Sequence, residues 1–246
     1  MKYLTTALAG MVLATAVQAA EITVISGGAI EPGLKAAAAA FEKQSGHKVK
    51  ITFNTTPQMR KRVAAGDTFD VIIAPPGAIK DFAAAGKVEA GGVDVGRVGS
   101  GVAVRPGAPV PAIANLDDIK KTVLEAESIV FNTATTGLYF ENLLKKWGIY
   151  EQVQGKTVRY TTGAEVMKHA LKGKGREVAF GPITEILLEK EHGLILVGPF
   201  PAEIQNYTSY IAVPMSAGTQ KAVAQELVKF LGGPVGKPLF VAAGIE

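Results

Sequence analysis

Hydroxyl-bearing and small residues follow apolar, strand-like runs at four places in this chain, and a predicted helix begins directly after each. The four junctions are residues 26–29, 54–57, 133–137 and 180–182. The start of a helix carries about half a positive charge and free backbone N–H groups, so several helix starts around one cleft can hold an anion without Lys or Arg. The sequence therefore predicts a binding site for a small anion.

The candidate donors on the first two junctions are Ser26, Gly28, Thr55 and Thr56. A hydroxyl or a backbone N–H donates a hydrogen bond to an anion oxygen, and such a bond is stronger in a dry cleft than in water. Thr56 is also a typical helix N-cap, with Pro57 at the first helical position. Thr56 could therefore cap the helix, bind the ligand or do both, because a capping residue can also face a ligand.

The other two junctions supply Thr136, Gly137 and Gly181. Gly137 lacks a Cβ, so a ligand could approach its backbone closely, whereas Gly181 stands before a Pro that suits the first turn of a helix. Tyr207 and Tyr210 lie on a later predicted strand. One of the two hydroxyls could reach the cleft while the other ring packs in the core.

Residues suited to covalent or metal chemistry are scarce. The chain has no Cys, and its three histidines have no partner at metal-ligand spacing and fall on predicted helix or loop surface. No nucleotide-binding or serine-nucleophile motif occurs. We therefore expect no metal, no cofactor and no enzymatic activity. The net charge of +4, from 26 basic and 22 acidic residues, is too small and scattered to indicate nucleic-acid binding.

The first residues have the form of an export signal. A basic start at Lys2 precedes an apolar stretch over 4–17, and small residues follow at Val17 and Ala19. Cleavage is expected near Ala19 or Ala20, so that 1–20 is a signal peptide and the mature protein resides in the periplasm.

The elements that would position the donors alternate between strands and helices, which predicts an α/β fold with a parallel sheet. A Gly-rich stretch after Gly86 leads into a short predicted strand at 101–105, and 207–213 reads as a strand returning in the opposite sense. Two crossings define two lobes with a hinge and a cleft. Lobe 1 is expected at 21–103 and 208–246, and lobe 2 at 104–207.

Several segments of the chain resemble the periplasmic molybdate-binding proteins of ABC transporters. They are 22–24 with 32–41, 53–66 with 70–74, 136–148, 199–201 and 230–244. The resemblance implies a two-lobed type II periplasmic binding protein fold, in which hydroxyls and main-chain N–H groups hold a tetrahedral oxyanion that a membrane permease receives.

The resemblance also implies ligand positions. The family's second-turn serine falls on Thr56, two main-chain donors fall on Thr136 and Gly181, and its tyrosine falls on Tyr210. The serine of the first loop falls on Ala29.

The leading interpretation is a monomeric, exported solute-binding protein that captures molybdate or tungstate by hinge closure and delivers it to an ABC-type permease. A small organic carboxylate or another oxyanion is the alternative ligand. A second hypothesis is an exported enzyme on the same frame, with Glu31 or Glu185 and Tyr210 as acid–base groups. A third is a signalling or adhesion module.

Overall fold

The structure is a computed structural model and describes residues 19–246. The predicted export signal at 1–20 lies almost wholly outside the described residues. Among the described residues, no helix is long and apolar enough to cross a membrane.

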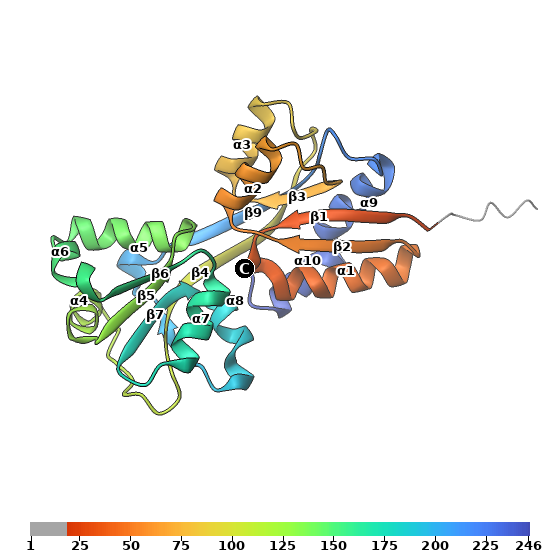
Figure 1. Cartoon of the computed structure of the whole chain (residues 1–246). Helices are drawn as coiled ribbons and strands as arrows, with labels where there is room; N and C mark the ends of the chain where they lie inside the picture. The colour runs from red at the N-terminus through yellow and green to blue at the C-terminus, as the bar shows by residue number, and fades with distance from the viewer. Residues whose placement is uncertain (1–18) are drawn as a thin grey trace, which may run out of the picture.

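A mixed nine-stranded sheet runs through both lobes of the molecule (Figure 1). Its strand order is β2-β1-β3-β9-β4-β7-β5-β6, and β8 pairs with β4 beside this path. The strands are β1 Glu21–Ser26, β2 Lys48–Phe53, β3 Val71–Ala74, β4 Val93–Val104, β5 Ser128–Asn132, β6 Thr157–Tyr160, β7 Glu177–Pro182, β8 Ile195–Pro199 and β9 Tyr207–Pro214.

Helices cover both faces of each half of the sheet. In the first half they are α1 Glu31–Ser45, α2 Thr56–Ala64, α3 Pro76–Ala84, α9 Lys221–Leu231 and α10 Gly236–Ala242. In the second half they are α4 Leu116–Glu125, α5 Thr135–Lys146, α6 Tyr150–Val153, α7 Gly163–Lys172 and α8 Ile183–Leu188, with short 3₁₀ turns between elements. Local signals explain many of these bounds: α1 ends at Gly46, which has a left-handed φ of 76°.

The predicted parallel arrangement holds within parts of each half-sheet. β1 pairs in parallel with β2 and β3, and β5 with β6 and β7. The crossing strands β4 and β9 instead run antiparallel to their neighbours, so the sheet is mixed.

Strand β4 connects the two halves, and its length corrects the short strand predicted at 101–105. Its residues up to Gly99 pair with β9, and its residues from Ser100 pair with β7. Gly96, at a φ of 127°, lies where the β4–β9 register shifts, so a bulge interrupts the pairing without ending the strand. The glycines that suggested a break in the sequence therefore lie within one continuous strand. The change of partner falls a few residues before the boundary predicted at 103/104.

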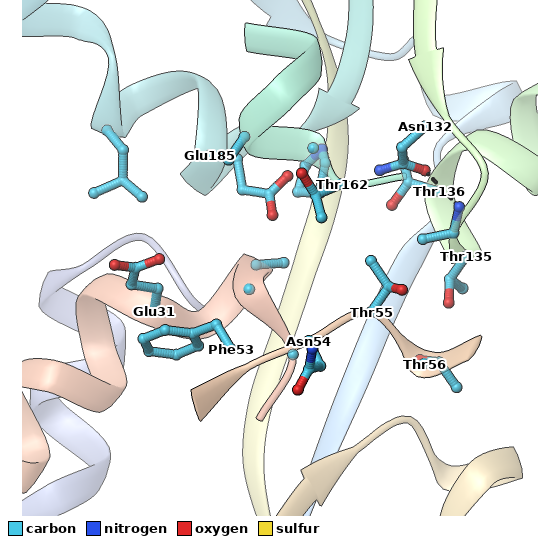
Figure 2. A pocket seen from close by; sticks show the side chains of 18 of the residues that line it. Glu31, Phe53, Asn54, Thr55, Thr56, Asn132, Thr135, Thr136, Thr162 and Glu185 are labelled. Atoms are coloured by element: carbon cyan, nitrogen blue, oxygen red, sulfur yellow. Dashed lines mark hydrogen bonds between the residues drawn. The ribbon is translucent and has the colours of Figure 1, made fainter. Parts of the chain in front are cut away.

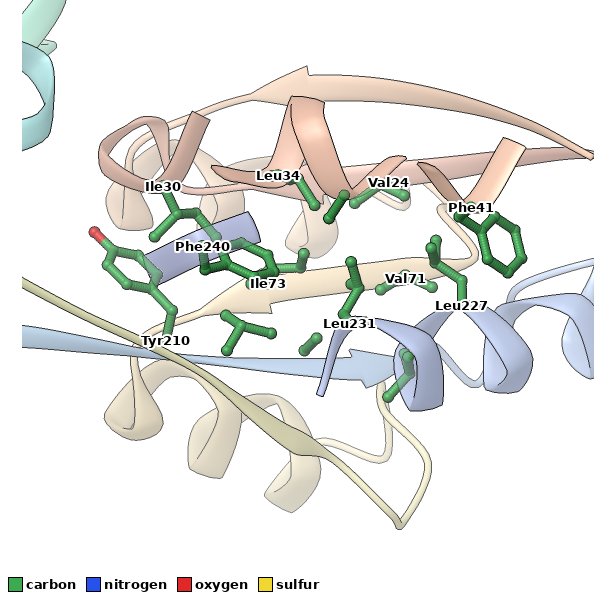
Figure 3. Close-up of a cluster of buried hydrophobic side chains, with 14 of the residues drawn as sticks. Val24, Ile30, Leu34, Phe41, Val71, Ile73, Tyr210, Leu227, Leu231 and Phe240 are labelled. Atoms are coloured by element: carbon green, nitrogen blue, oxygen red, sulfur yellow. The ribbon is translucent and has the colours of Figure 1, made fainter. Parts of the chain in front are cut away.

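The first lobe is built around an apolar cluster between the sheet and helices α1, α9 and α10 (Figure 3). Val24 and Ile73 from the sheet meet Leu34 and Phe41 from α1, and Phe240 from α10. The second lobe has its own cores, one of which stacks the rings of Phe140 and Phe180 with centroids 4.0 Å apart. Since each lobe has its own core, each can move as a body about the strands that join them.

Two elements of the second lobe were not predicted. β6 is a short four-residue strand with alternating Thr157, Val158, Arg159 and Tyr160, and α6 is a single turn. Neither is long enough to show a clear hydrophobic period in the sequence.

Candidate functional site

A cavity of about 230 Å³ opens between the two lobes, and Figure 2 shows side chains from both lobes facing it. The starts of α2, α5 and α7, and the turn before α1, contribute to its wall. Its lining residues are Gly27, Gly28, Ala29, Glu31, Phe53, Asn54, Thr55, Thr56, Asn132, Ala134, Thr135, Thr136, Thr162, Gly163, Ala164, Pro182, Glu185, Leu188, Glu189 and Tyr210.

The sequence-predicted candidates divide into two groups in space. Six line the cavity: Gly28, Ala29, Thr55, Thr56, Thr136 and Tyr210. Ser26, Gly137 and Gly181 are buried outside its lining. The Ser26 hydroxyl donates to the Gly27 carbonyl at 3.2 Å, and a Cβ at Gly181 would meet Met167. Ligand contact at each of these positions stays a prediction.

Helix α2 begins at Thr56, whereas the prediction that Thr56 is the N-cap places the first helical residue at Pro57. Thr55 is its N-cap, and Thr56 is its first helical residue. The Thr55 N–H donates to the Gln58 side chain at 2.8 Å, which stabilises the turn. Because Thr55 takes the capping position, the prediction that Thr56 caps the helix is wrong, and Thr56 stands at the cavity wall as a residue of the first turn.

At the start of α5, Asn132 holds the turn that sequence reasoning overlooked. Its side-chain oxygen accepts hydrogen bonds from the N–H groups of Ala134 and Gly137, both at 3.0 Å. A Cβ on Gly137 would lie 1.8 Å from the Asn132 carbonyl oxygen. The missing Cβ of Gly137 therefore allows its backbone to pack closely against Asn132 within the turn, and the Gly137 N–H already has Asn132 as its hydrogen-bond partner. An Asn shortly before a helix is a typical turn former, so the signal was present in the sequence.

The start of α7 is a third helix terminus at the cavity, and it too was missed as a site element. Thr162 is the N-cap, and the Glu165 carboxylate accepts from its N–H at 2.9 Å and from its hydroxyl at 2.8 Å. This is the Thr-x-x-Glu capping box, which can be recognised from sequence. Next to it, Gly163 lies directly against the carboxyl group of Glu185.

Glu185, on α8, places a carboxyl group between the lobes. An ideal Cβ on Gly163 of the second lobe would lie 1.6 Å from Glu185 Oε2, and one on Gly28 of the first lobe 3.0 Å from Oε1. The Oε2 atom is buried and has no hydrogen-bond partner within residues 19–246. Burial and the negative charge of Glu31 raise the pKa of Glu185 from 4.5 to about 7.

Tyr210 is the tyrosine that faces the cavity. Its ring packs against Gly27, and burial together with the nearby Glu185 raises the pKa of its hydroxyl. Tyr207 is 40% exposed and lies under the guanidinium group of Arg97, 4.2 Å from the ring centroid. Their spacing on β9 explains this difference, because residues three apart point to opposite faces of an extended strand. The burial pattern of β9 follows this alternation, with Thr208 and Tyr210 buried and Tyr207 exposed.

The charges around the cavity are acidic. Glu31, Glu185 and Glu189 are in its wall, and no Lys or Arg is among its lining residues. Glu31 forms an ion pair with Lys35 at 2.5 Å, and Glu189 is bonded to His192 at 2.8 Å, so Glu185 is the wall carboxyl without such a partner among the described residues. The site thus combines hydroxyl and N–H donors with one carboxyl group whose pKa is raised to about 7.

The described residues contain no group of three or more His, Asp or Glu placed to hold a metal ion. One detail of the histidine prediction is wrong: His47 is buried, stacks on Phe41, and its Nδ1 accepts from the Ala20 N–H at 3.0 Å.

The lobes also touch directly beside the cavity. The Thr184 hydroxyl on α8 donates to the carbonyl oxygen of Ala29 in the first lobe. Together with the Glu185 contacts, this bond joins α8 to the turn before α1.

A two-lobed α/β fold with a cleft bounded by helix starts defines a class of ligand-capturing proteins, and comparison with known proteins gives the family. The profile of the bacterial extracellular solute-binding protein family matches residues 22–246, and the chain belongs to this family. The predicted type of fold and the predicted relationship to molybdate-binding proteins are confirmed.

Two relatives of similar identity to this chain have different names, one that of an enzyme and one that of a binding protein. The chain is 29% identical over 230 residues to an aconitate isomerase from Pseudomonas sp., covering 91% of this chain and 87% of the relative. It is 28% identical over 252 residues to the molybdate-binding protein ModA of Azotobacter vinelandii, covering 98% and 96%. The solved periplasmic molybdate-binding protein of A. vinelandii has the same fold, with a TM-score of 0.72 at 16% identity over 92% of this chain and 98% of that one.

Proposed function

We propose that this protein captures a small anion in the cleft between its lobes and delivers it to an ABC-type permease from the periplasm, as a monomer and without chemical change to the ligand. The observation that carries this proposal is the convergence of the helix starts at Thr56, Thr135 and Gly163 on one cavity. Their N–H groups and helix dipoles favour negative charge there.

Hinge closure is the proposed mechanism, with lobe 1 at 21–103 and 208–246 and lobe 2 at 104–207. The donors at Thr55 and Thr56 belong to the first lobe, and those at Thr135 and Thr136 to the second. A ligand that contacts both sets binds the closed form better than the open form, so binding shifts the population toward closure. A permease can then recognise the closed form.

Molybdate and tungstate are the first ligands to test, because ModA is a relative over 98% of this chain. Small organic carboxylates come second. The test is a thermal-shift panel of molybdate, tungstate, sulfate, phosphate and carboxylates. Ligand at about 100 times its dissociation constant adds about 2.7 kcal/mol, which corresponds to a rise in Tm of about 5–10 °C for a chain of this size. A panel in which no anion raises the Tm would contradict anion capture.

Thr56→Ala tests the contribution of one wall residue. If the Thr56 hydroxyl donates a hydrogen bond to the ligand, the variant weakens binding by about 1–3 kcal/mol, since a buried donor to a charged group is lost. Thr68→Ala is the matched control, because Thr68 is exposed and outside the cavity wall. Equal affinity of both variants would show that Thr56 has only a structural role.

An isomerase activity is the second candidate function, and Glu185 is the observation that favours it. A carboxyl group with a pKa near 7 can accept a proton from carbon and return it at neutral pH, and Tyr210 lies beside it. Proton removal and return at different carbons of an unsaturated acid moves a double bond and needs no co-reactant. The aconitate isomerase relative makes cis- and trans-aconitate the substrates to test.

The assay follows the ratio of the two aconitate isomers by proton NMR. Interconversion by the wild-type protein that Glu185→Gln abolishes would support the enzyme, and the same ratio with and without protein would exclude this activity on aconitate.

A further inference from the structure

An unpaired acid group inside the cleft carries information about the ligand. Buried polar atoms in proteins almost always have a hydrogen-bond partner, yet Glu185 Oε2 has none within the described chain. Arg159 Nε is the other side-chain atom of this kind among residues 19–246, and Arg159 does not line the cavity. In Figure 2 the Glu185 carboxyl group points from α8 toward the cavity. Oε2 itself lies against Gly163, but Glu185 lines the cavity, so a ligand there is within reach of the other oxygen of its carboxyl group, which lies on the Gly28 side.

The surroundings determine whether Glu185 accepts or donates. Glu31 from α1 and Glu189 from the end of α8 are the other acids in the wall, and Tyr210 from β9 is the neighbouring titratable hydroxyl. On α7, Glu165 is bonded to Thr162, while His192 after α8 is bonded to Glu189. Lys35 pairs with Glu31. No cation in the cavity wall stabilises an ionised Glu185, and its pKa of about 7 keeps a substantial protonated fraction at neutral pH.

The cavity also has the size and apolar surface for a carbon skeleton. Phe53 and Leu188 are in its wall, together with Ala29, Ala134 and Pro182. Its volume is about 230 Å³. A tetrahedral oxyanion has five heavy atoms and no apolar part. It would make no use of the apolar side chains and would hold both of its charges close to the acids of the wall.

We propose that the ligand is an organic acid with two or three carboxylates, and that Glu185 in its protonated form donates a hydrogen bond to one of them while the helix starts bind another. This inference rests on the proposed anion capture and names the ligand class for the same cavity. An organic acid spreads its charges along its skeleton, so one carboxylate can meet Glu185 while a second lies at α2 and α5. The carbon atoms between them contact Phe53 and Leu188.

The inference predicts a dependence of affinity on pH. An ionised Glu185 cannot donate, and it repels the ligand carboxylate, so binding weakens as the pH rises through 7. With only the protonated form competent, affinity falls about 25-fold between pH 6.5 and 8.5. The carboxyl groups of the ligand are largely ionised across this range, so their own titration contributes little.

The test is isothermal titration calorimetry of the full mature protein with tricarballylate, succinate and molybdate at pH 6.5 and 8.5. Wild-type protein should bind tricarballylate or succinate with the stated loss at high pH. Glu185→Gln keeps an N–H donor and cannot ionise, so its affinity should be the same at both pH values. Glu191→Gln, on an exposed turn outside the wall, is the control and should behave as wild type.

Three outcomes overturn the inference. Binding of molybdate without either carboxylate would refute the ligand class and leave anion capture standing. Carboxylate binding with the same pH dependence in Glu185→Gln would refute the role of Glu185. No binding of any of the three anions would count against the inference and the proposed function together.

Discussion

Replacing Glu185 by Gln should stabilise the protein at alkaline pH, although the residue lies in the wall of the cavity between the lobes. Because burial and Glu31 raise the pKa of the folded-state carboxyl to about 7, the folded protein holds a proton that the unfolded chain releases near 4.5. Between these values the folded state binds more protons, so stability falls as the pH rises, and the full cost is reached above pH 7.

The size of the effect follows from the two pKa values. The difference between 4.5 and about 7 corresponds to roughly 3 kcal/mol, at about 1.4 kcal/mol per pH unit. Gln has nearly the same shape and no charge, so it avoids this cost. Glu185→Gln should unfold at about the same urea concentration as wild type at pH 4.5. At pH 8.5 it should be more stable by about 3 kcal/mol, or about 6–12 °C in Tm.

The assay is urea unfolding of the ligand-free protein, followed by circular dichroism at pH 4.5, 6, 7 and 8.5. Glu191→Gln should match wild type at every pH, because Glu191 is exposed. A stability difference between Glu185→Gln and wild type that does not change with pH would refute the reasoning, since it would show that Glu185 has no raised pKa in the folded protein.

Three further predictions concern packing and the contact between the lobes. Gly137→Ala should destabilise the protein by about 3 kcal/mol in urea unfolding, because the new Cβ would overlap the Asn132 carbonyl oxygen, whereas Gly155→Ala has open space and should cost little. Asp70→Asn should remove stability at neutral pH, and its effect should shrink as the pH falls below 3.8. Burial opposes the charge of Asp70, but hydrogen bonds from Thr23, Gln220 and Thr219 outweigh it and lower the pKa below 3.8. The stabilisation is therefore present above that value and lost as the pH falls. An acid-unfolding curve of Asp70→Asn equal to that of wild type would contradict this prediction. Thr184→Val should lose the hydrogen bond to the Ala29 carbonyl, which is worth about 1 kcal/mol. Calorimetry should then show ligand binding about fivefold weaker, and small-angle scattering should show a larger fraction of the open form. Unchanged affinity would show that the bond does not favour closure.

Much of the candidate site was predictable because helix caps are local. The junctions at Thr55 and Thr136 lie at the cavity as the alternation of strands and helices indicates. The turn-forming Asn132 before α5 and the start of α7 at Thr162 were missed, although their signals, an Asn turn and a capping box, are equally local.

Other features required the tertiary structure. Gly137 looked suited to ligand approach, but the space that its missing side chain leaves is filled by Asn132. The glycines before Ser100 looked like a break, but pairing with β9 holds them in one strand. In both cases the competing partner is a backbone group whose position the local sequence does not specify.

The sequence by itself determined the order of strands and helices, the family resemblance and the placement of hydroxyls at helix starts, because propensity, capping and hydrophobic period act over a few residues. Only the tertiary structure decided that Glu185 meets Gly28, Gly163 and Tyr210 in one place. These residues are far apart in the chain and are brought together by two separate lobes joined through β4 and β9. Burial and the field of Glu31, which set the protonation of Glu185, exist only after that assembly.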